Sequence, residues 1–356
     1  MKHGGDLLSY KEYYDGELVD YSSNINPLGI PKGLEKELRG SFKKLDTYPD
    51  IKYRKLRKSV AEYLKCNEAN TVLGNGAVEL IDNFIFLATR VLIYIPSFLE
   101  YEERALIHNK EAIYIPYKED FAIDIKKFAN IIQEGDTVIL GNPNNPTGLR
   151  IKKEEILIIY SIVKKKKGFL VLDEAFFEFC PDDYDSIELF RKTEYENLAI
   201  IRAATKFFAL PGIRLGYGCA SVKMAMKVEK LQLPWSINTL AEVAGNYIFH
   251  DKKYIEESKE YIEKERRYLL NELSKIKIIK PYFTHTNYIL IELLEIEEEY
   301  VFNFFLTRGI IIRKCSTFRG LSNNFIRIAI KDHDNNIRLV EIFKELEKES
   351  LKNKAD

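Results

Sequence analysis

The stretch DTVILGNPNNPTG, residues 136–148, joins a short apolar run to a loop of glycines, asparagines and prolines. The run from Thr137 to Leu140 is typical of a strand that is buried on both faces of a sheet. The loop after it contains two prolines, which restrict the backbone and hold Asn145 between them at low entropic cost. Asn145 is therefore a candidate ligand-binding residue. A structural turn with side-chain-to-backbone hydrogen bonds accounts for the same residues equally well.

Similar apolar runs lie on both sides of this stretch and alternate with helical patterns. We expect strands at 91–96, 112–117, 136–140, 169–176, 198–203 and 214–220, and helices at 53–65, from 77 onward, around 98–107 and at 153–166. This alternation indicates a largely parallel α/β sheet. After Pro234 two long helical patterns, 238–250 and 254–275, follow without an intervening strand, and short strands then alternate with helices to 349. The change predicts a second, smaller α+β domain.

The composition excludes several classes of protein. The chain has 356 residues, 46% of them apolar, and 54 Lys and Arg residues balance 54 Asp and Glu residues. The balance gives no electrostatic reason to expect a nucleic acid or a membrane surface as partner. Four cysteines without a CxxC pair and five scattered histidines predict no metal site. Because no apolar signal segment opens the chain, we expect a cytoplasmic protein.

Three further candidates for chemistry lie where strands end, which is where open α/β sheets bind ligands. In GNGAVEL (74–80) a glycine turn precedes a helix, and the backbone N–H groups there can hold a phosphate. Asp173 ends an apolar strand, so it needs a partner such as a protonated ring nitrogen; an internal salt bridge is the alternative. Lys206 follows a strand in the apolar segment TKFFALPG. A desolvated lysine has a lowered pKa and can form a Schiff base. Arg214 can complete the phosphate site as a bidentate donor, and the alternative for Lys206 and Arg214 is a surface pair on a loop.

In this order along the chain, NPNNPTG, DEAF and TKFFALPGIRLGY resemble the class I/II aminotransferases of fold type I, which use pyridoxal 5'-phosphate. The resemblance covers nearly the whole chain. It implies a large domain with a mostly parallel seven-stranded sheet plus a smaller α+β domain. The expected division is an N-terminal arm at 1–35 that belongs to the small domain and covers the active site, a large cofactor-binding domain at 36–250 and a C-terminal small domain at 251–356.

The resemblance also implies roles for individual residues. Lys206 would carry the cofactor covalently and shuttle protons, Asp173 would pair with its ring nitrogen, and Asn145 would donate to its phenolic oxygen. The remaining cofactor residues would be Gly76, Ala77, Val78, Thr205 and Arg214 at the phosphate, Phe98 stacked on the ring, and Tyr48 reaching the phosphate of a neighbouring subunit. A homodimer with shared active sites is therefore expected.

Two residues depart from the family pattern. Many relatives carry a serine where this chain has Ala203, so a hydroxyl donor to the phosphate is lost and Thr205 is a doubtful substitute. Many also carry a tyrosine where this chain has Phe176, which leaves Asn145 as the main donor to the ring oxygen.

The ends of the chain resemble L-threonine-O-3-phosphate decarboxylases of the cobalamin pathway, in KHGGDL, DYSSNINPLGIP, IRKCSTFRGL and FIRIAIKDHDNN. The related histidinol-phosphate aminotransferases usually lack the HGG start and usually show glycine where this chain has Lys331. By this resemblance Arg327 would bind the substrate carboxylate, and Arg319 has no assigned role. The substrate phosphate would be held by His3, Gly4, Asn24 and Arg313. Three alternatives remain: the decarboxylase, an aminotransferase for histidinol phosphate or a related amine, and a non-catalytic ligand-binding relative.

Overall fold

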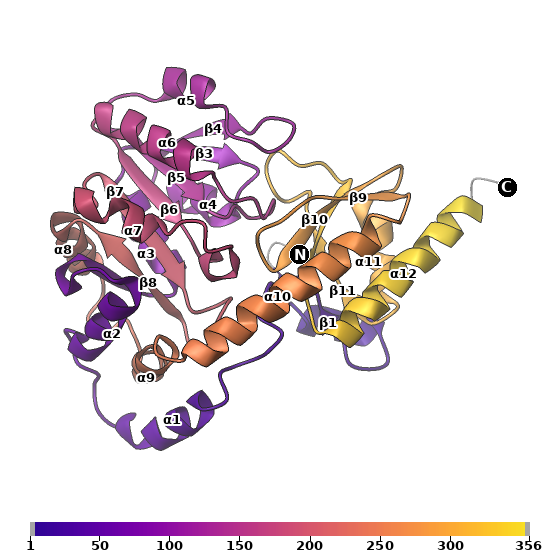
Figure 1. Cartoon of the computed structure of the whole chain (residues 1–356), viewed down its shortest axis with the longest axis horizontal. Helices are drawn as coiled ribbons and strands as arrows, with labels where there is room; N and C mark the ends of the chain where they lie inside the picture. Colours follow the sequence, from indigo (N-terminus) through magenta and orange to yellow (C-terminus); the bar gives the residue numbers. More distant parts are fainter. Residues whose placement is uncertain (1–3, 353–356) are drawn as a thin grey trace.

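The computed structural model describes residues 4–352, and its largest element is a seven-stranded sheet (Figure 1). The strands are β2 (Thr71–Asn75), β3 (Arg90–Ile95), β4 (Glu111–Pro116), β5 (Thr137–Gly141), β6 (Phe169–Asp173), β7 (Leu198–Ala203) and β8 (Leu215–Ala220). Their order is β2-β8-β7-β6-β5-β3-β4. β8 is antiparallel to both of its neighbours, and the other neighbouring strands are parallel. The expected mostly parallel seven-stranded sheet is confirmed.

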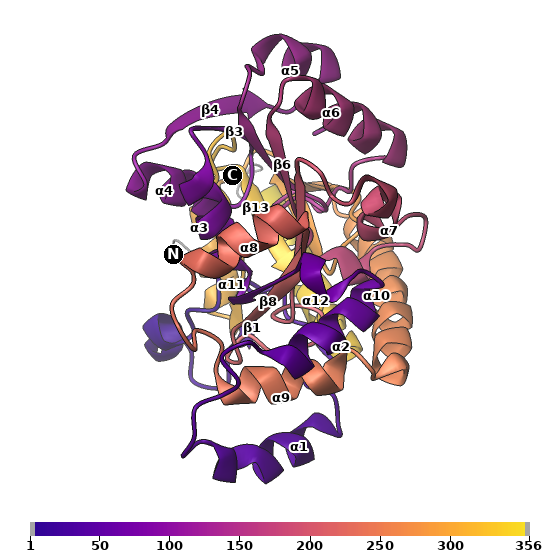
Figure 2. The same cartoon turned by 90° about the vertical axis from the view of Figure 1, so that its left-hand side faces the viewer.

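Both faces of this sheet are buried, because successive side chains along a strand point to opposite faces. In β5, Val138 and Leu140 enter one core and Ile139 enters the other. The helices α2 (Arg54–Leu64), α5 (Ile125–Ile131), α6 (Lys153–Lys165), α7 (Ser186–Phe190) and α9 (Thr239–Ile248) supply buried residues to the first core, and α3 (Ala77–Leu87), α4 (Leu99–Ile107) and α8 (Val222–Leu231) to the second. Figure 2 shows α3, α4 and α8 on one side of the sheet. The apolar runs without polar alternation follow from this double cover.

A smaller part of the fold contains a four-stranded antiparallel sheet with the order β12-β13-β10-β9. Its elements are β9 (Ile279–Pro281), β10 (Tyr288–Leu293), β12 (Arg313–Lys314), β13 (Phe325–Ala329), α10 (Lys252–Leu273), α11 (Glu298–Leu306) and α12 (His333–Lys352). Strand β1 (Val19–Asp20) pairs with β11 (Ile310–Ile311), so the N-terminal segment joins this part, while α1 (Leu34–Ser41) packs on α9. The boundaries at 35/36 and 250/251 stay a prediction, and the β1–β11 pairing supports only the placement of the N-terminal segment with the smaller part.

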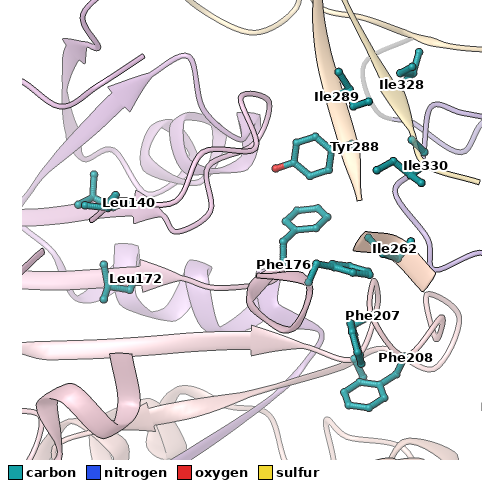
Figure 3. Packing of buried hydrophobic residues seen from close by; sticks show 14 of the residues in the cluster. Leu140, Leu172, Phe176, Phe207, Phe208, Ile262, Tyr288, Ile289, Ile328 and Ile330 are labelled. Carbon is teal, nitrogen blue, oxygen red and sulfur yellow. The ribbon is translucent and has the colours of Figure 1, made fainter. Parts of the chain in front are cut away.

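One hydrophobic core connects the two sheets. Figure 3 shows Tyr288 of β10 facing Phe176, which follows β6. The two rings meet edge to face with centroids 4.9 Å apart, and the Tyr288 hydroxyl donates to the Asn144 carbonyl at 2.7 Å. The expected strand at 169–176 is therefore too long: β6 ends at Asp173, and Phe176 leaves the sheet to fill the junction between the two parts.

Candidate active site

The carboxyl ends of β5, β6 and β7 lie side by side, because Gly141 is in register with Asp173 and Asp173 with Ile201. The loops after these strands therefore open at one edge of the sheet, where the switch in strand order leaves room for a ligand. A cavity of about 250 Å³ lies at this edge. The predicted site residues that line it are Gly4, Asn24, Ala77, Val78, Phe98, Asn145, Asp173, Thr205, Lys206, Arg214, Arg313 and Arg327.

The loop after β5 is held by the asparagines on its inner side. Asn144 is buried and donates from its amide to the Pro96 carbonyl and to the Thr147 hydroxyl, both at 3.1 Å. The loop is closed by the Gly148 N–H, which donates to the Asn144 carbonyl at 2.7 Å. Asn145 is left facing the cavity, and its Oδ1 accepts from Arg327. The loop is thus a structural turn that also positions the Asn145 side chain at the cavity.

Asp173 has no cationic partner within ion-pair distance among residues 4–352, so the alternative of an internal salt bridge is wrong. Its carboxylate is buried and accepts from the Tyr101 hydroxyl at 2.7 Å and from the Ala175 N–H at 3.0 Å. Burial raises the pKa of Asp173, and these two donors oppose the rise. A cation supplied by a ligand would favour the ionised form of this carboxylate.

Lys206 follows β7 in an apolar segment where Phe207 and Phe208 are fully buried. Burial lowers the pKa of Lys206 to about 8, and the positive charge of Arg327 adds to that effect, while Asp20 opposes it. At pH 7 roughly a tenth of Lys206 is thus the neutral amine that attacks a carbonyl group, far more than for an ordinary lysine.

The turn before α3 and the arginine before β8 meet as expected for an anion site. Gly76 has φ +77°, and a Cβ there would lie 2.3 Å from Nη2 of Arg214. The guanidinium is therefore pressed against the first residues of α3, where Ala77 and Val78 line the cavity. Backbone N–H groups at a helix start and a forked cation together suit a phosphate. Arg214 is an exposed residue that also lines the cavity, so its role at a phosphate stays a prediction.

Two buried arginines lie opposite each other on β12 and β13, since Arg313 is in register with Arg327. Their exposed fractions are 2% and 5%. Arg327 donates from Nη2 to the Ser22 carbonyl at 2.8 Å, and its Nε is buried without a partner among the residues described. Burial and the neighbouring Arg327 lower the pKa of Arg313 to about 10. Like charges placed opposite in a sheet repel, so this pair is arranged to receive anions.

The remaining predicted residues lie elsewhere. Tyr48 is 78% exposed and does not line the cavity. Its ring stacks on that of Trp235, with the ring centroids 4.5 Å apart. Arg319 pairs with Glu102 outside that lining. His3 lies outside the described residues. Ala203 and Phe176, the two departures from the family pattern, both line the cavity.

Sequence reasoning missed Tyr101 and the turn that begins at Asp20. The Asp20 carboxylate accepts from both the N–H and the hydroxyl of Ser22 and of Ser23, and the two serines line the cavity. Ser22 in turn holds Arg327 through its carbonyl and accepts from the Gly5 N–H at 2.8 Å. Their positions in the sequence could have indicated these residues. Ser22 and Ser23 directly precede Asn24, and Tyr101 lies one helical turn after Phe98.

Residues 17–343 match the family aminotransferase class I and II, and the chain belongs to this family of pyridoxal-phosphate enzymes. A protein of Caldanaerobacter subterraneus subsp. tengcongensis, provisionally named threonine-phosphate decarboxylase, is 39% identical, with 99% of this chain and 98% of that protein covered. A solved histidinol-phosphate aminotransferase from Clostridium acetobutylicum is 42% identical, with a TM-score of 0.90 and coverage of 93% of this chain and 100% of that chain. A solved L-threonine-O-3-phosphate decarboxylase from Porphyromonas gingivalis shares the fold, at 23% identity, a TM-score of 0.81 and coverage of 92% and 98%.

The residues present fit pyridoxal 5'-phosphate. No cation of residues 4–352 pairs with the buried Asp173 carboxylate, the Gly76–Arg214 contact leaves no room for a side chain beside the start of α3, and Lys206 is an amine with a lowered pKa. Two further observations concern metal ions and membranes. Among the described residues, no group of three or more Asp, Glu, His or Cys side chains is placed to hold a metal ion. None of the helices within residues 4–352 combines the length and the apolar character that crossing a membrane needs.

Proposed function

We propose that this protein decarboxylates L-threonine O-3-phosphate to (R)-1-amino-2-propanol O-2-phosphate, a reaction of cobalamin biosynthesis. The observation that carries the proposal is the pair Arg313 and Arg327, which are buried, lie opposite on adjacent strands and line one cavity. A substrate with both a carboxylate and a phosphate matches two forked cations in one place.

The charges of the cavity lining favour this substrate over an imidazole-bearing one. Within the described lining, the charged residues are Asp173, Lys206, Arg214, Arg313 and Arg327. Asp173 is assigned to the cofactor ring, so the lining retains no carboxylate to pair with an imidazolium group. We assign the substrate carboxylate to Arg327, and the substrate phosphate to His3, Gly4, Asn24 and Arg313.

On the cofactor side we assign Asp173 to the ring nitrogen, Asn145 to the phenolic oxygen and Phe98 to the ring face. Arg327 donates to the Asn145 Oδ1, so the amide N–H₂ is the part of Asn145 that would donate to the phenolic oxygen. The cofactor phosphate goes to Gly76, Ala77, Val78, Thr205 and Arg214.

When bound, pyridoxal phosphate supplies an electron sink for charge that develops at the substrate α-carbon. The residues of the site would decide which bond breaks, by holding one substituent of the α-carbon perpendicular to the cofactor ring. Arg327 would hold the carboxylate in that direction, so that carbon dioxide leaves and an electron pair remains at the α-carbon. Lys206 would return a proton to that carbon, and its lowered pKa suits a group that both takes and gives protons near neutral pH.

The alternative function is an aminotransferase for histidinol phosphate or a related amine, with 2-oxoglutarate and glutamate as partners. The 42% identity to the Clostridium acetobutylicum protein favours it. The two reactions use the same parts and differ in which bond at the α-carbon is turned out of the plane.

The test is product identity. Purified protein loaded with cofactor is incubated with L-threonine O-3-phosphate, with and without 2-oxoglutarate, and released carbon dioxide is measured. We expect release that does not depend on 2-oxoglutarate. If histidinol phosphate and 2-oxoglutarate give glutamate while threonine phosphate gives no carbon dioxide, the aminotransferase takes the place of this proposal.

We also propose a cytoplasmic homodimer in which Tyr48 reaches the partner's cofactor phosphate. Tyr48 and its stacking partner Trp235 are exposed by 78% and 40% in the single chain, and an exposed aromatic pair suits an interface. Further exposed apolar side chains near them in sequence are Phe42, Leu45, Ile51 and Leu233.

A further inference from the structure

Tyr101 lies in the first turn of α4, on the face of that helix that packs against the sheet. Its side chain is 2% exposed, and its hydroxyl donates to Oδ2 of Asp173 at 2.7 Å. Burial keeps the pKa of Tyr101 well above its ordinary value, so the phenol stays protonated and acts as a donor. The residue also lines the cavity.

The hydrogen bond matters because Asp173 has few other means of staying ionised. Among residues 4–352 its donors are the Tyr101 hydroxyl at Oδ2 and the Ala175 N–H at Oδ1, and burial raises the pKa of Asp173 against the effect of both. The Ala175 bond comes from the backbone and is fixed by the turn. The Tyr101 bond is therefore the one that a side chain supplies, and a hydrogen bond to a charged group in a buried site is among the stronger ones.

Tyr101 also contacts the residue assigned to the face of the cofactor ring. Phe98 is the N-cap of α4, three residues earlier, and its ring meets that of Tyr101 edge to face at 5.7 Å with an interplanar angle of 88°. One side chain thus touches both the group beside the ring nitrogen and the group over the ring.

We propose that Tyr101 is a positioning residue that aligns Asp173 with the ring nitrogen of the cofactor and holds Phe98 across the same ring. The inference rests on the proposed assignment of Asp173 to that nitrogen. It does not depend on which substrate the enzyme uses, so cofactor binding alone can test it.

The test compares two cofactors in Tyr101→Phe, a change that keeps the ring and removes one hydroxyl. Dissociation constants are measured by absorbance titration of cofactor-free protein with pyridoxal phosphate and with its 1-deaza analogue, which has carbon in place of the ring nitrogen. We expect Tyr101→Phe to weaken binding of pyridoxal phosphate about tenfold, and binding of the analogue by less than about twofold.

Tyr217→Phe is the matched control. Tyr217 is fully buried and donates to the Glu178 carboxylate, also at 2.7 Å, but it does not line the cavity. Both variants lose one buried phenol-to-carboxylate bond, so their cofactor-free melting temperatures should fall by similar amounts. Only Tyr101→Phe should discriminate between the two cofactors.

Asp173→Asn separates the possible failures. If Asp173→Asn also fails to discriminate between pyridoxal phosphate and the analogue, the assignment of Asp173 is wrong and the inference falls with it. If Asp173→Asn discriminates and Tyr101→Phe weakens both cofactors equally or neither, the positioning role of Tyr101 is wrong. The second result does not bear on the decarboxylase proposal, whereas the first removes its argument that the lining retains no carboxylate for an imidazolium group.

Discussion

Replacing Arg327 with lysine tests how the proposed substrate carboxylate is held. The change keeps the positive charge in a nearly closed position, since Arg327 is 5% exposed. It removes the planar fork, which now donates to the Ser22 carbonyl from Nη2 and to Asn145 from Nη1. Arg327 also has an Nε without a protein partner among the residues described. The single ammonium group of a lysine lacks the planar fork that donates to the Ser22 carbonyl, to the Asn145 side chain and to a substrate oxygen from separate nitrogens.

The magnitude follows from the number of bonds that change. A carboxylate held by two N–H groups of Arg327 loses one charge-assisted hydrogen bond when lysine replaces it, at a cost of about 2 kcal/mol. That cost corresponds to roughly thirtyfold in kcat/KM for L-threonine O-3-phosphate. Cofactor content should change little, because the cofactor phosphate and ring nitrogen are assigned to other residues and only the Asn145 contact depends on Arg327.

The assay is carbon dioxide release at several substrate concentrations, with cofactor content measured on the same preparation. Arg319→Lys is the control, because Arg319 is 51% exposed in its side chain and pairs with Glu102 outside the cavity lining. It should stay within about twofold of the parent enzyme. If kcat/KM falls by less than about threefold in an Arg327→Lys enzyme that is fully loaded with cofactor, Arg327 does not hold the carboxylate by two hydrogen bonds.

Three further outcomes are expected. Because the pKa of Lys206 is lowered to about 8, an acylating reagent should label Lys206 of the cofactor-free protein half-maximally near that pH; a rate that keeps rising to about pH 10, as for an ordinary lysine, contradicts this. Gly76→Ala should weaken cofactor binding about tenfold or more, since its methyl group would lie 2.3 Å from Nη2 of Arg214. Gly212→Ala, whose methyl group would have nothing within 4 Å, should leave binding unchanged. Equal cofactor dissociation constants for the two variants would contradict a phosphate site at Gly76. Mixing Lys206→Ala with Tyr48→Phe should restore one intact site per mixed dimer, and activity that stays at the sum of the two separate variants would argue against shared sites.

Much of the large sheet could be predicted from the sequence, because a strand buried on both faces shows a continuous apolar run. The expected strands 198–203 and 214–220 appear as Leu198–Ala203 and Leu215–Ala220. The end of β6 could not be predicted, because Phe176 is as apolar as a strand residue and leaves the sheet only to meet Tyr288, which is more than a hundred positions away. Local pattern carries no information about such a distant contact.

Some residues of the candidate site could also be predicted from the sequence, and others could not. The sequence alone indicated Lys206, Asp173, Asn145 and Arg214, because each chemical type lies in a distinctive local setting at the end of a strand. Tyr101 looked like an ordinary aromatic residue of a helix, since its significance is one hydroxyl that reaches an acid 72 positions later.

By itself, the sequence determined the parallel sheet, the smaller second part and the order of the chemical groups along the chain, because hydrophobic period and turn residues act locally. Only the tertiary structure decided that Arg313 and Arg327 lie opposite each other in one cavity and that Arg319 pairs outside its lining. Only the fold removed every cation from reach of Asp173 among the described residues and buried Lys206 enough to lower its pKa. The physical reason is that charge strength, proton affinity and vacant hydrogen bonds depend on burial and on neighbours, and neighbours are set by how strands register and pack rather than by adjacency in the chain.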